Sequence, residues 1–157
     1  MVIMNSADAI KNWSEATETV IKGKPIFIED ESNKMILSNL EFVELLLSGY
    51  TYSAKKHIEN DKSITLSLNE IDLVENASTE DASKTLLAKS ILEYAENFYY
   101  EYQLWSSAPN KQAEIPYVFK ALILNDVDKI KSNIKIKSTH YSHKKLWLFC
   151  LLKFQGE

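Results

Sequence analysis

Two histidines and one cysteine near the C-terminus are the residues whose types and spacing could hold a metal ion. His140 and His143 form an HxxH pair, and Cys150 is the single cysteine. A zinc site needs four protein ligands, or three with a water molecule, and the remaining histidine, His57, is distant in the sequence. Histidines in a polar loop are usually solvated, so we expect neither a metal site nor a cofactor.

Motifs for catalysis are also missing from the sequence. It contains no G-x-S-x-G nucleophile elbow, no glycine-rich phosphate loop and no HExxH zinc motif. With three glycines in the chain, a glycine loop that cradles phosphate is nearly excluded. These observations favour a protein that acts by binding and is not an enzyme.

Residues 59–101 combine acidic and aromatic side chains, as protein-binding surfaces do. The segment contains ten acidic residues and three lysines. An acidic surface attracts and covers a basic partner, and tyrosine and tryptophan are frequent binding hot spots. Alternatively, the aromatic side chains form the protein's own core and the acids form its solvated face. The residues that we expect to contact a partner are Glu93, Glu96, Tyr99, Tyr100, Glu101 and Trp105.

The basic residues are all lysines and are concentrated at the end of the chain. Residues 1–110 hold nine lysines against 18 acids, whereas residues 111–157 hold nine lysines against four acids. The absence of arginine weakens any case for sequence-specific reading of DNA. The basic end could bind nucleic acid, or it could be a solvated edge strand protected by lysine, which we favour. The residues concerned are Lys129, Lys131, Lys135, Lys137, Lys144 and Lys145, with Tyr141 and Trp147 between or beside them.

The sequence favours a cytoplasmic protein. A single cysteine indicates a reducing compartment, because it cannot form a disulfide within the chain. No stretch of 18 uncharged apolar residues is present, and residues 1–6 lack the features of a secretory signal.

The first fifty residues predict a strand, a helix, a β-hairpin and a second helix. Residues 2–4 are an apolar edge strand, and Ser6 starts a helix that ends before Gly23. Residues 26–28 and 35–37 form the hairpin, and Ser38 with Glu41 caps the second helix. The apolar residues of the first helix recur at spacings of three and four, which predicts one buried stripe through Ile10, Trp13, Thr17, Val20 and Ile21.

The remainder of the chain is expected to be mainly helical. Residues 51–62 are polar and predict a connection, and residues 63–68 alternate in polarity like a strand. A long helix is expected from about Ser78 to Trp105, with a stripe through Leu87, Ile91, Tyr94, Phe98, Tyr102 and Trp105. Shorter helices are expected at residues 114–124 and 126–132.

Two runs in the first fifty residues resemble the prevent-host-death/YefM family of antitoxins. The first is the helix sequence Ala-Ile-Lys-Asn-Trp-Ser at residues 9–14. The second is Gly-Lys-Pro at residues 23–25, which leads into the hairpin, followed by Leu-Glu-Phe at residues 40–42. This resemblance covers residues 2–50, about a third of the chain, and implies an α/β homodimer that represses its own operon and neutralises a toxin.

The resemblance also implies that the N-terminal part contacts DNA. The chain departs from the family pattern at two points: Ile10 stands in place of arginine, and the hairpin tip at residues 29–33 is acidic. Acidic side chains close to DNA repel its phosphates. The residues that remain as possible DNA contacts are Lys11, Asn12, Lys22, Lys24 and Lys34.

Residues 64–99 are faintly similar to HicB-type antitoxins, which pair with the HicA mRNA-cleaving toxins. The similarity rests on a strand followed by Thr-Glu-Asp-Ala at residues 79–82. We therefore expect an α+β protein with an N-terminal Phd/YefM-like dimerisation domain at residues 1–58 and a mainly helical partner-binding region at residues 59–157. The leading hypothesis is an antitoxin for a basic, RNA-cleaving toxin. The alternative is a DNA-binding transcriptional regulator without a toxin.

Overall fold

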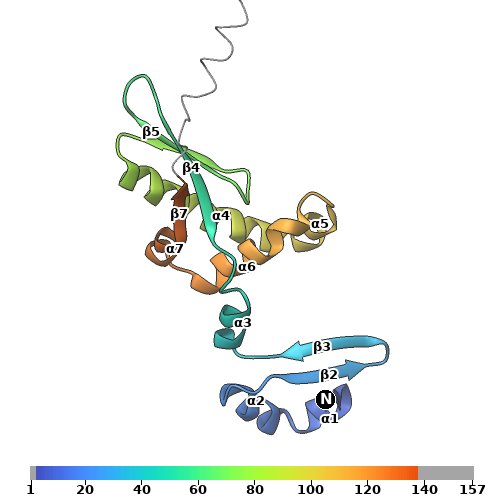
Figure 1. The fold of residues 1–157 in the computed structure, drawn as a ribbon. Coiled ribbons are helices and arrows are strands. Elements are labelled where there is room, and N and C mark those ends of the chain that lie inside the picture. The colour runs from blue at the N-terminus through green and yellow to red at the C-terminus, as the bar shows by residue number, and fades with distance from the viewer. Residues whose placement is uncertain (1–2, 138–157) are drawn as a thin grey trace, which may run out of the picture.

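The computed structural model describes residues 3–137, which form two β-sheets, each with its own helices (Figure 1). The His140–His143 pair, Cys150, Lys144, Lys145, Tyr141 and Trp147 lie outside the described residues. A short helix, α3, lies between the N-terminal sheet and the larger C-terminal unit (Figure 1). The α+β class expected from the sequence is confirmed.

The first sheet has three strands in the order β1-β2-β3. Strands β2 and β3 form the expected hairpin, and β1 is an edge strand that runs parallel to β2. Two helices follow β1, and α3 follows the hairpin. The elements are β1 (Ile3–Asn5), α1 (Ser6–Lys11), α2 (Trp13–Ile21), β2 (Ile26–Asp30), β3 (Asn33–Leu37) and α3 (Leu40–Leu46).

The first helix differs from the prediction because it breaks at Asn12. The Asn12 backbone has φ −112° and ψ 33°, and its side-chain amide donates to the Asp8 carbonyl oxygen at 3.0 Å. This break changes which side chains face the sheet. The expected stripe is therefore wrong at Ile10, Trp13 and Ile21, which are exposed, and confirmed at Val20, which is buried. The other buried positions are Ala9 and Ala16.

Both helix starts lie one residue away from the predicted caps. Asn5 rather than Ser6 caps α1, and its side chain accepts a hydrogen bond from the Ala7 amide. Asn39 rather than Ser38 caps α3, and its side chain accepts from the Phe42 amide at 2.9 Å. Asparagine is as good a cap as serine, so two candidate caps in a row left this choice open.

The second sheet has four strands in the order β6-β5-β4-β7. Strand β4 pairs antiparallel with β5 and parallel with β7, while β5 and β6 are antiparallel. The prediction that residues 51–62 form a polar connection is wrong, because β4 occupies most of that range at the centre of the sheet. The strands are β4 (Tyr52–Ile58), β5 (Ile64–Leu68), β6 (Val74–Ala77) and β7 (Ile134–Lys137).

Helices cover one face of this second sheet. The predicted long helix is interrupted at Glu101, and Pro116 lies in the first turn of α6, where proline is tolerated. The two shorter helices expected after residue 110 are confirmed. The elements are α4 (Glu80–Tyr100), α5 (Tyr102–Ser107), a 3₁₀ helix (Gln112–Glu114), α6 (Ile115–Leu124) and α7 (Val127–Asn133).

The main core lies between α4 and the second sheet. α4 packs against β5, β6, α6 and α7. Ser83, the polar side chain at the centre of this contact, is satisfied because its hydroxyl donates to the Ile64 carbonyl oxygen at 2.6 Å. The largest buried side chains include Tyr52, Leu66, Leu87, Ile91, Phe98, Val118 and Ile130.

The buried hydroxyl of Tyr52 leads us to expect that this unit becomes less stable at alkaline pH. This hydroxyl donates to the Tyr117 carbonyl oxygen at 2.9 Å, and burial, aided by Glu70, raises the pKa of Tyr52 far above the ordinary 10.0. The unfolded chain therefore loses this proton before the folded chain does. Stability should fall as pH rises above 10, by at most about 1.4 kcal/mol per pH unit from this residue.

Replacing Tyr52 with phenylalanine tests this expectation. At pH 8 the variant should lose about 1 kcal/mol, because one hydrogen bond is removed. At pH 11 the difference from the wild type should shrink, since phenylalanine has no proton to lose. Urea unfolding at both pH values measures this, with Tyr100→Phe as the exposed control. A difference that stays constant with pH would contradict the assignment.

Candidate partner-binding surfaces

Helix α4 has a buried apolar face and an exposed acidic face. Thr79 caps the helix by accepting from the Ala82 amide at 3.2 Å, and Glu80 and Asp81 lie in its first turn, where negative charge suits the helix dipole. Leu87 and Phe98 face the core. The opposite face is therefore free to present charge to solvent.

Three of the predicted contact residues share that exposed face. Glu93, Glu96 and Tyr100 are spaced at three and four residues on α4 and are all exposed, with 90% of Tyr100 accessible. An exposed tyrosine beside two carboxylates is suited to a lysine or arginine of a partner, through ion pairing and cation–π contact. The structure thus brings together half of the predicted set.

Tyr99 belongs to a neighbouring aromatic cluster that the sequence analysis missed. Its ring lies edge-on to Phe119 of α6 at 6.2 Å, and the ring of Tyr102 meets Phe119 at 6.0 Å. Tyr99 is 59% exposed, and Leu104, two residues beyond Tyr102, is 66% exposed. The sequence of α6 could have indicated this cluster. The helix is apolar on more than one face, so one apolar face stays at the surface after another packs into the core.

Trp105 lies mostly against its own chain. Its ring stacks on Phe98 at 6.1 Å, and its indole nitrogen donates to Glu101 Oε2 at 3.2 Å. The Glu101 carboxylate is thereby also engaged within the chain. These two residues therefore offer less free surface to a partner than Tyr99 and Tyr100 do.

A partly buried polar network fixes α5 and the 3₁₀ helix against α4. Glu114 accepts from the Tyr94 hydroxyl and from Lys111 Nζ, the latter at 2.9 Å. The Lys111 ammonium also lies 5.4 Å from the centre of the Tyr94 ring. Burial, together with the bond to Glu114, raises the pKa of Tyr94, and the Glu114 carboxylate raises the pKa of Lys111. This network positions the segment that carries Tyr102 and Leu104.

The predicted DNA contacts are spread over the N-terminal unit. Lys11 ends α1, Lys22 follows α2, and Lys34 lies on β3. All three are exposed, and Lys22 forms an ion pair with Glu18 at 2.7 Å. The structure does not bring these three lysines together into one cluster.

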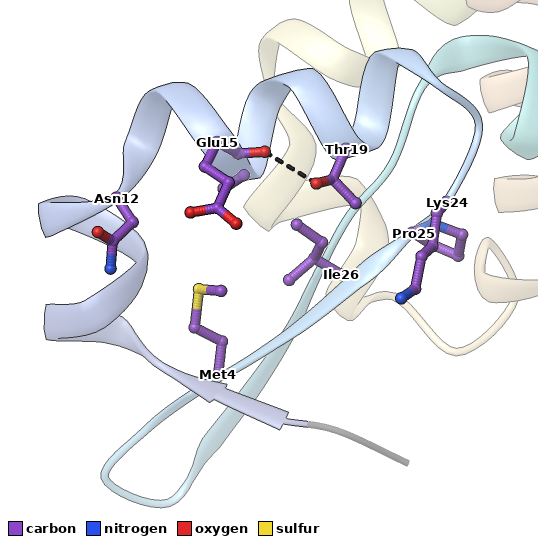
Figure 2. A pocket seen from close by; sticks show the side chains of 8 residues that line it. Met4, Asn12, Glu15, Thr19, Lys24, Pro25 and Ile26 are labelled. Carbon is purple, nitrogen blue, oxygen red and sulfur yellow. Dashed lines mark hydrogen bonds between the residues drawn. The ribbon is translucent and has the colours of Figure 1, made fainter.

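Asn12 and Lys24 lie at opposite ends of one hollow between α2 and β2 (Figure 2). The cavity has a volume of about 220 Å³, and Met4 and Ile26 form its apolar floor. The Glu15 carboxylate also lines it, which lowers its attraction for phosphate. A continuous basic surface is therefore not formed at this point.

The side of the first sheet away from α1 and α2 carries exposed apolar side chains. Ile3, Phe27 and Ile36 are partners in register and so share this face, where Phe27 is 38% and Ile36 is 50% exposed. Leu40, Leu45 and Leu46 of α3 are also largely exposed. Apolar surface of this extent is typical of interaction sites.

Within residues 3–137, no group of three or more potential metal ligands is found. In the same part of the chain, no helix is long and apolar enough to cross a membrane.

Comparison with known proteins identifies the family. A PHD-like family model, described as an antitoxin of a toxin–antitoxin system of the RelE/RelB type, matches residues 1–136. A crystal structure from Syntrophomonas wolfei subsp. wolfei, described as the antitoxin part of a proposed toxin/antitoxin system, is similar with a TM-score of 0.84 and 25% identity. That match covers 88% of this chain and 100% of the other. No curated protein gives a significant match.

The family match spans both sheets and the helices that present the acidic and aromatic surface. The chain belongs to this PHD-like family of toxin–antitoxin antitoxins.

Proposed function

We propose that this antitoxin neutralises a basic, RNA-cleaving toxin by covering its active face with the α4–α6 surface. We define this surface as Tyr99, Tyr100, Tyr102, Leu104 and Phe119, with Glu93 and Glu96 beside them. The observation that carries the proposal is the exposure of Tyr99 and Tyr100 next to carboxylates on the long helix α4. Steric cover and charge pairing are sufficient for this mechanism, so the protein acts without catalysis or a cofactor.

The charge of the partner follows from the function of an RNA-cleaving toxin. Such a toxin needs a basic face for the phosphates of RNA, and an acidic surface competes for that face. The likeness of residues 64–99 to HicB-type antitoxins supports the same class of partner.

Co-expression with the product of the neighbouring gene tests the proposal. We expect that product to be short and basic, to arrest growth alone, and to form a complex with this chain that weakens at high salt. No complex and no rescue of growth would refute the proposal.

Self-association through the N-terminal unit is the second part of the proposal. It is supported by the uncovered face with Phe27 and Ile36, and by the likeness of residues 2–50 to the homodimeric prevent-host-death/YefM family. We place the boundary of this unit at residues 47–51 and not after residue 58 as expected from the sequence, since β4 pairs with strands of the second sheet.

Replacing Phe27 and Ile36 with lysine should convert the homodimer to a monomer. Two charges on the contacting face would have to be buried without partners, which costs several kcal/mol. Light scattering after size-exclusion chromatography measures the mass. The control is Val74→Lys, at an exposed apolar position on β6 in the other sheet. A wild-type chain that is monomeric at high concentration would contradict this part.

A DNA-binding regulator without a toxin remains the second candidate function. It is favoured by the exposed Lys11, Lys24 and Lys34 on the N-terminal unit. Binding to the chain's own promoter, lost on Lys11→Glu or Lys24→Glu, would support it. A gel-shift experiment without binding at low salt would exclude both this function and autorepression.

A further inference from the structure

The second sheet has an open face that is lined by lysines. Alternation along β4 and β7 sends Tyr52, Ala54 and Ile134 to the helices, where they are buried. Lys55 and Lys137 are direct register partners on the opposite face, and Lys135 lies two residues earlier on β7. Tyr52 and Ala54 belong to the same core as Leu87 and Ile91 of α4, so the lysines are on the face away from α4, the helix that lies behind these strands in Figure 1.

These three lysines are exposed and have no carboxylate partner within residues 3–137. Two nearby lysines behave differently: Lys56 pairs with Glu80 at 2.6 Å, and Lys131 pairs with Asp81 at 2.7 Å. Like charges directly opposite one another destabilise a sheet. The remaining sequence, residues 138–157, adds three lysines and one glutamate, so it is also basic.

Protection of the sheet edge explains the lysines of β7 but not Lys55. β7 is the edge strand, where lysine discourages pairing with other chains, whereas Lys55 lies on an inner strand between β5 and β7. The register partner of Lys55 on β5 is Ser67, whose hydroxyl adds a hydrogen-bond donor to the same face. An inner-strand lysine needs another reason, and an anionic partner supplies one.

Carboxylates lie at both ends of this face, and the described ones are already engaged. Glu70 Oε2 accepts from the Ser53 amide at 2.8 Å at one end. Glu59 Oε1 accepts from the Thr65 hydroxyl at 2.5 Å at the other, near Asp61 in the β4–β5 turn. The positive surface is therefore a bounded patch across β4 and β7.

We propose that Lys55, Lys135 and Lys137 form a binding patch for the phosphate backbone of double-stranded nucleic acid, without sequence preference. Lysine is a point charge suited to phosphate, and it lacks the planar fork that reads guanine. On this face of β4 and β7 the described residues include no phenylalanine, tyrosine or tryptophan, and His57 is the one ring beside Lys55, so bases of a single strand lack an extended stacking platform. The same face of β4 and β7 also carries no exposed apolar anchor of the kind found in protein interfaces; Val74, which is exposed on this face, lies on β6, two strands from Lys55.

This patch lies on a different surface from the proposed toxin contacts and the N-terminal DNA contacts. This proposal can therefore fail without the proposed function failing. Growth rescue by the patch variant tests the proposed function separately.

The test uses the full-length chain in which Lys55, Lys135 and Lys137 are replaced by glutamine. Its matched control replaces Lys62, Lys89 and Lys129, which are exposed and change the net charge equally. Fluorescence anisotropy measures binding of a labelled DNA duplex of unrelated sequence between 50 and 200 mM salt. Single-stranded RNA of the same length and polyglutamate are the other two probes.

The patch variant should bind the duplex at least about tenfold more weakly at low salt, with a salt slope that falls by up to roughly 2.7. The control should stay within about twofold of the wild type. The proposal is overturned if the wild type does not bind the duplex, if both variants lose affinity equally, or if the patch variant loses binding only to polyglutamate or to the single strand. Thermal unfolding of the patch variant should match or exceed that of the wild type, because a like-charge contact is removed.

Discussion

Replacing Tyr99 and Tyr100 with alanine should weaken the toxin complex by roughly 30-fold to 1,000-fold. Central tyrosines that become buried on binding commonly contribute about 2 kcal/mol or more each, although such effects are rarely additive. Both side chains are more than half exposed in the free chain, so their removal should leave the free energy of unfolding within about 0.5 kcal/mol. Isothermal titration calorimetry with the purified toxin measures the affinity, and urea unfolding measures the stability.

A matched control separates this effect from a general loss of apolar surface. Ile58→Ala with Val74→Ala removes two exposed side chains from β4 and β6, and both lie away from the α4–α6 surface. The control should bind the toxin normally. Unchanged affinity of the tyrosine variant, or an equal loss in both variants, would show that the toxin binds elsewhere.

The acidic residues should act mainly on the rate of association. Glu93 and Glu96 are exposed and solvated, so their attraction to a basic partner is long-ranged and screened by salt. The aromatic side chains should instead control the rate of dissociation. This division explains why both kinds of residue are needed on one surface.

The sequence was sufficient to place three of the proposed contact residues on one face, but not to show which of the six are exposed. Spacing placed Glu93, Glu96 and Tyr100 on one helix face, because the helix is long and regular. It could not show that Trp105 turns inward, since α4 ends at Tyr100 and α5 restarts in a new direction. Nor could spacing bring Phe119 next to Tyr99, because that contact joins two helices.

The fold was predictable where local signals agreed. The hairpin around residues 30–33, the strand at 64–68 and the helices after residue 110 were confirmed. β4 was not predicted because its hydropathy does not alternate. Its buried residues include Ser53 and Ala54, which are adjacent, and its exposed residues include Lys55 and His57. The break at Asn12 was not predicted because a side-chain hydrogen bond, rather than glycine or proline, ends α1.

Phe98 joins the core to the α4–α6 surface. It is fully buried, and its ring lies 6.1 Å from Tyr94 and Trp105 and 6.2 Å from Tyr102. It therefore supports α5 from beneath, while Phe119 supports Tyr99 and Tyr102 from the side.

Replacing Phe98 with alanine should lower the free energy of unfolding by about 3–5 kcal/mol, because a large cavity is left among three rings that cannot all collapse into it. Phe119→Ala removes the same side chain at a half-buried site, and its cost should be clearly smaller. Denaturant unfolding of the two variants measures the difference. Equal losses would contradict the assignment of Phe98 to the core and Phe119 to the surface. If Phe119→Ala lowers the free energy of unfolding less than Phe98→Ala does, the fold of the Phe119→Ala variant is intact. Weaker toxin binding by that variant would then reflect a lost contact.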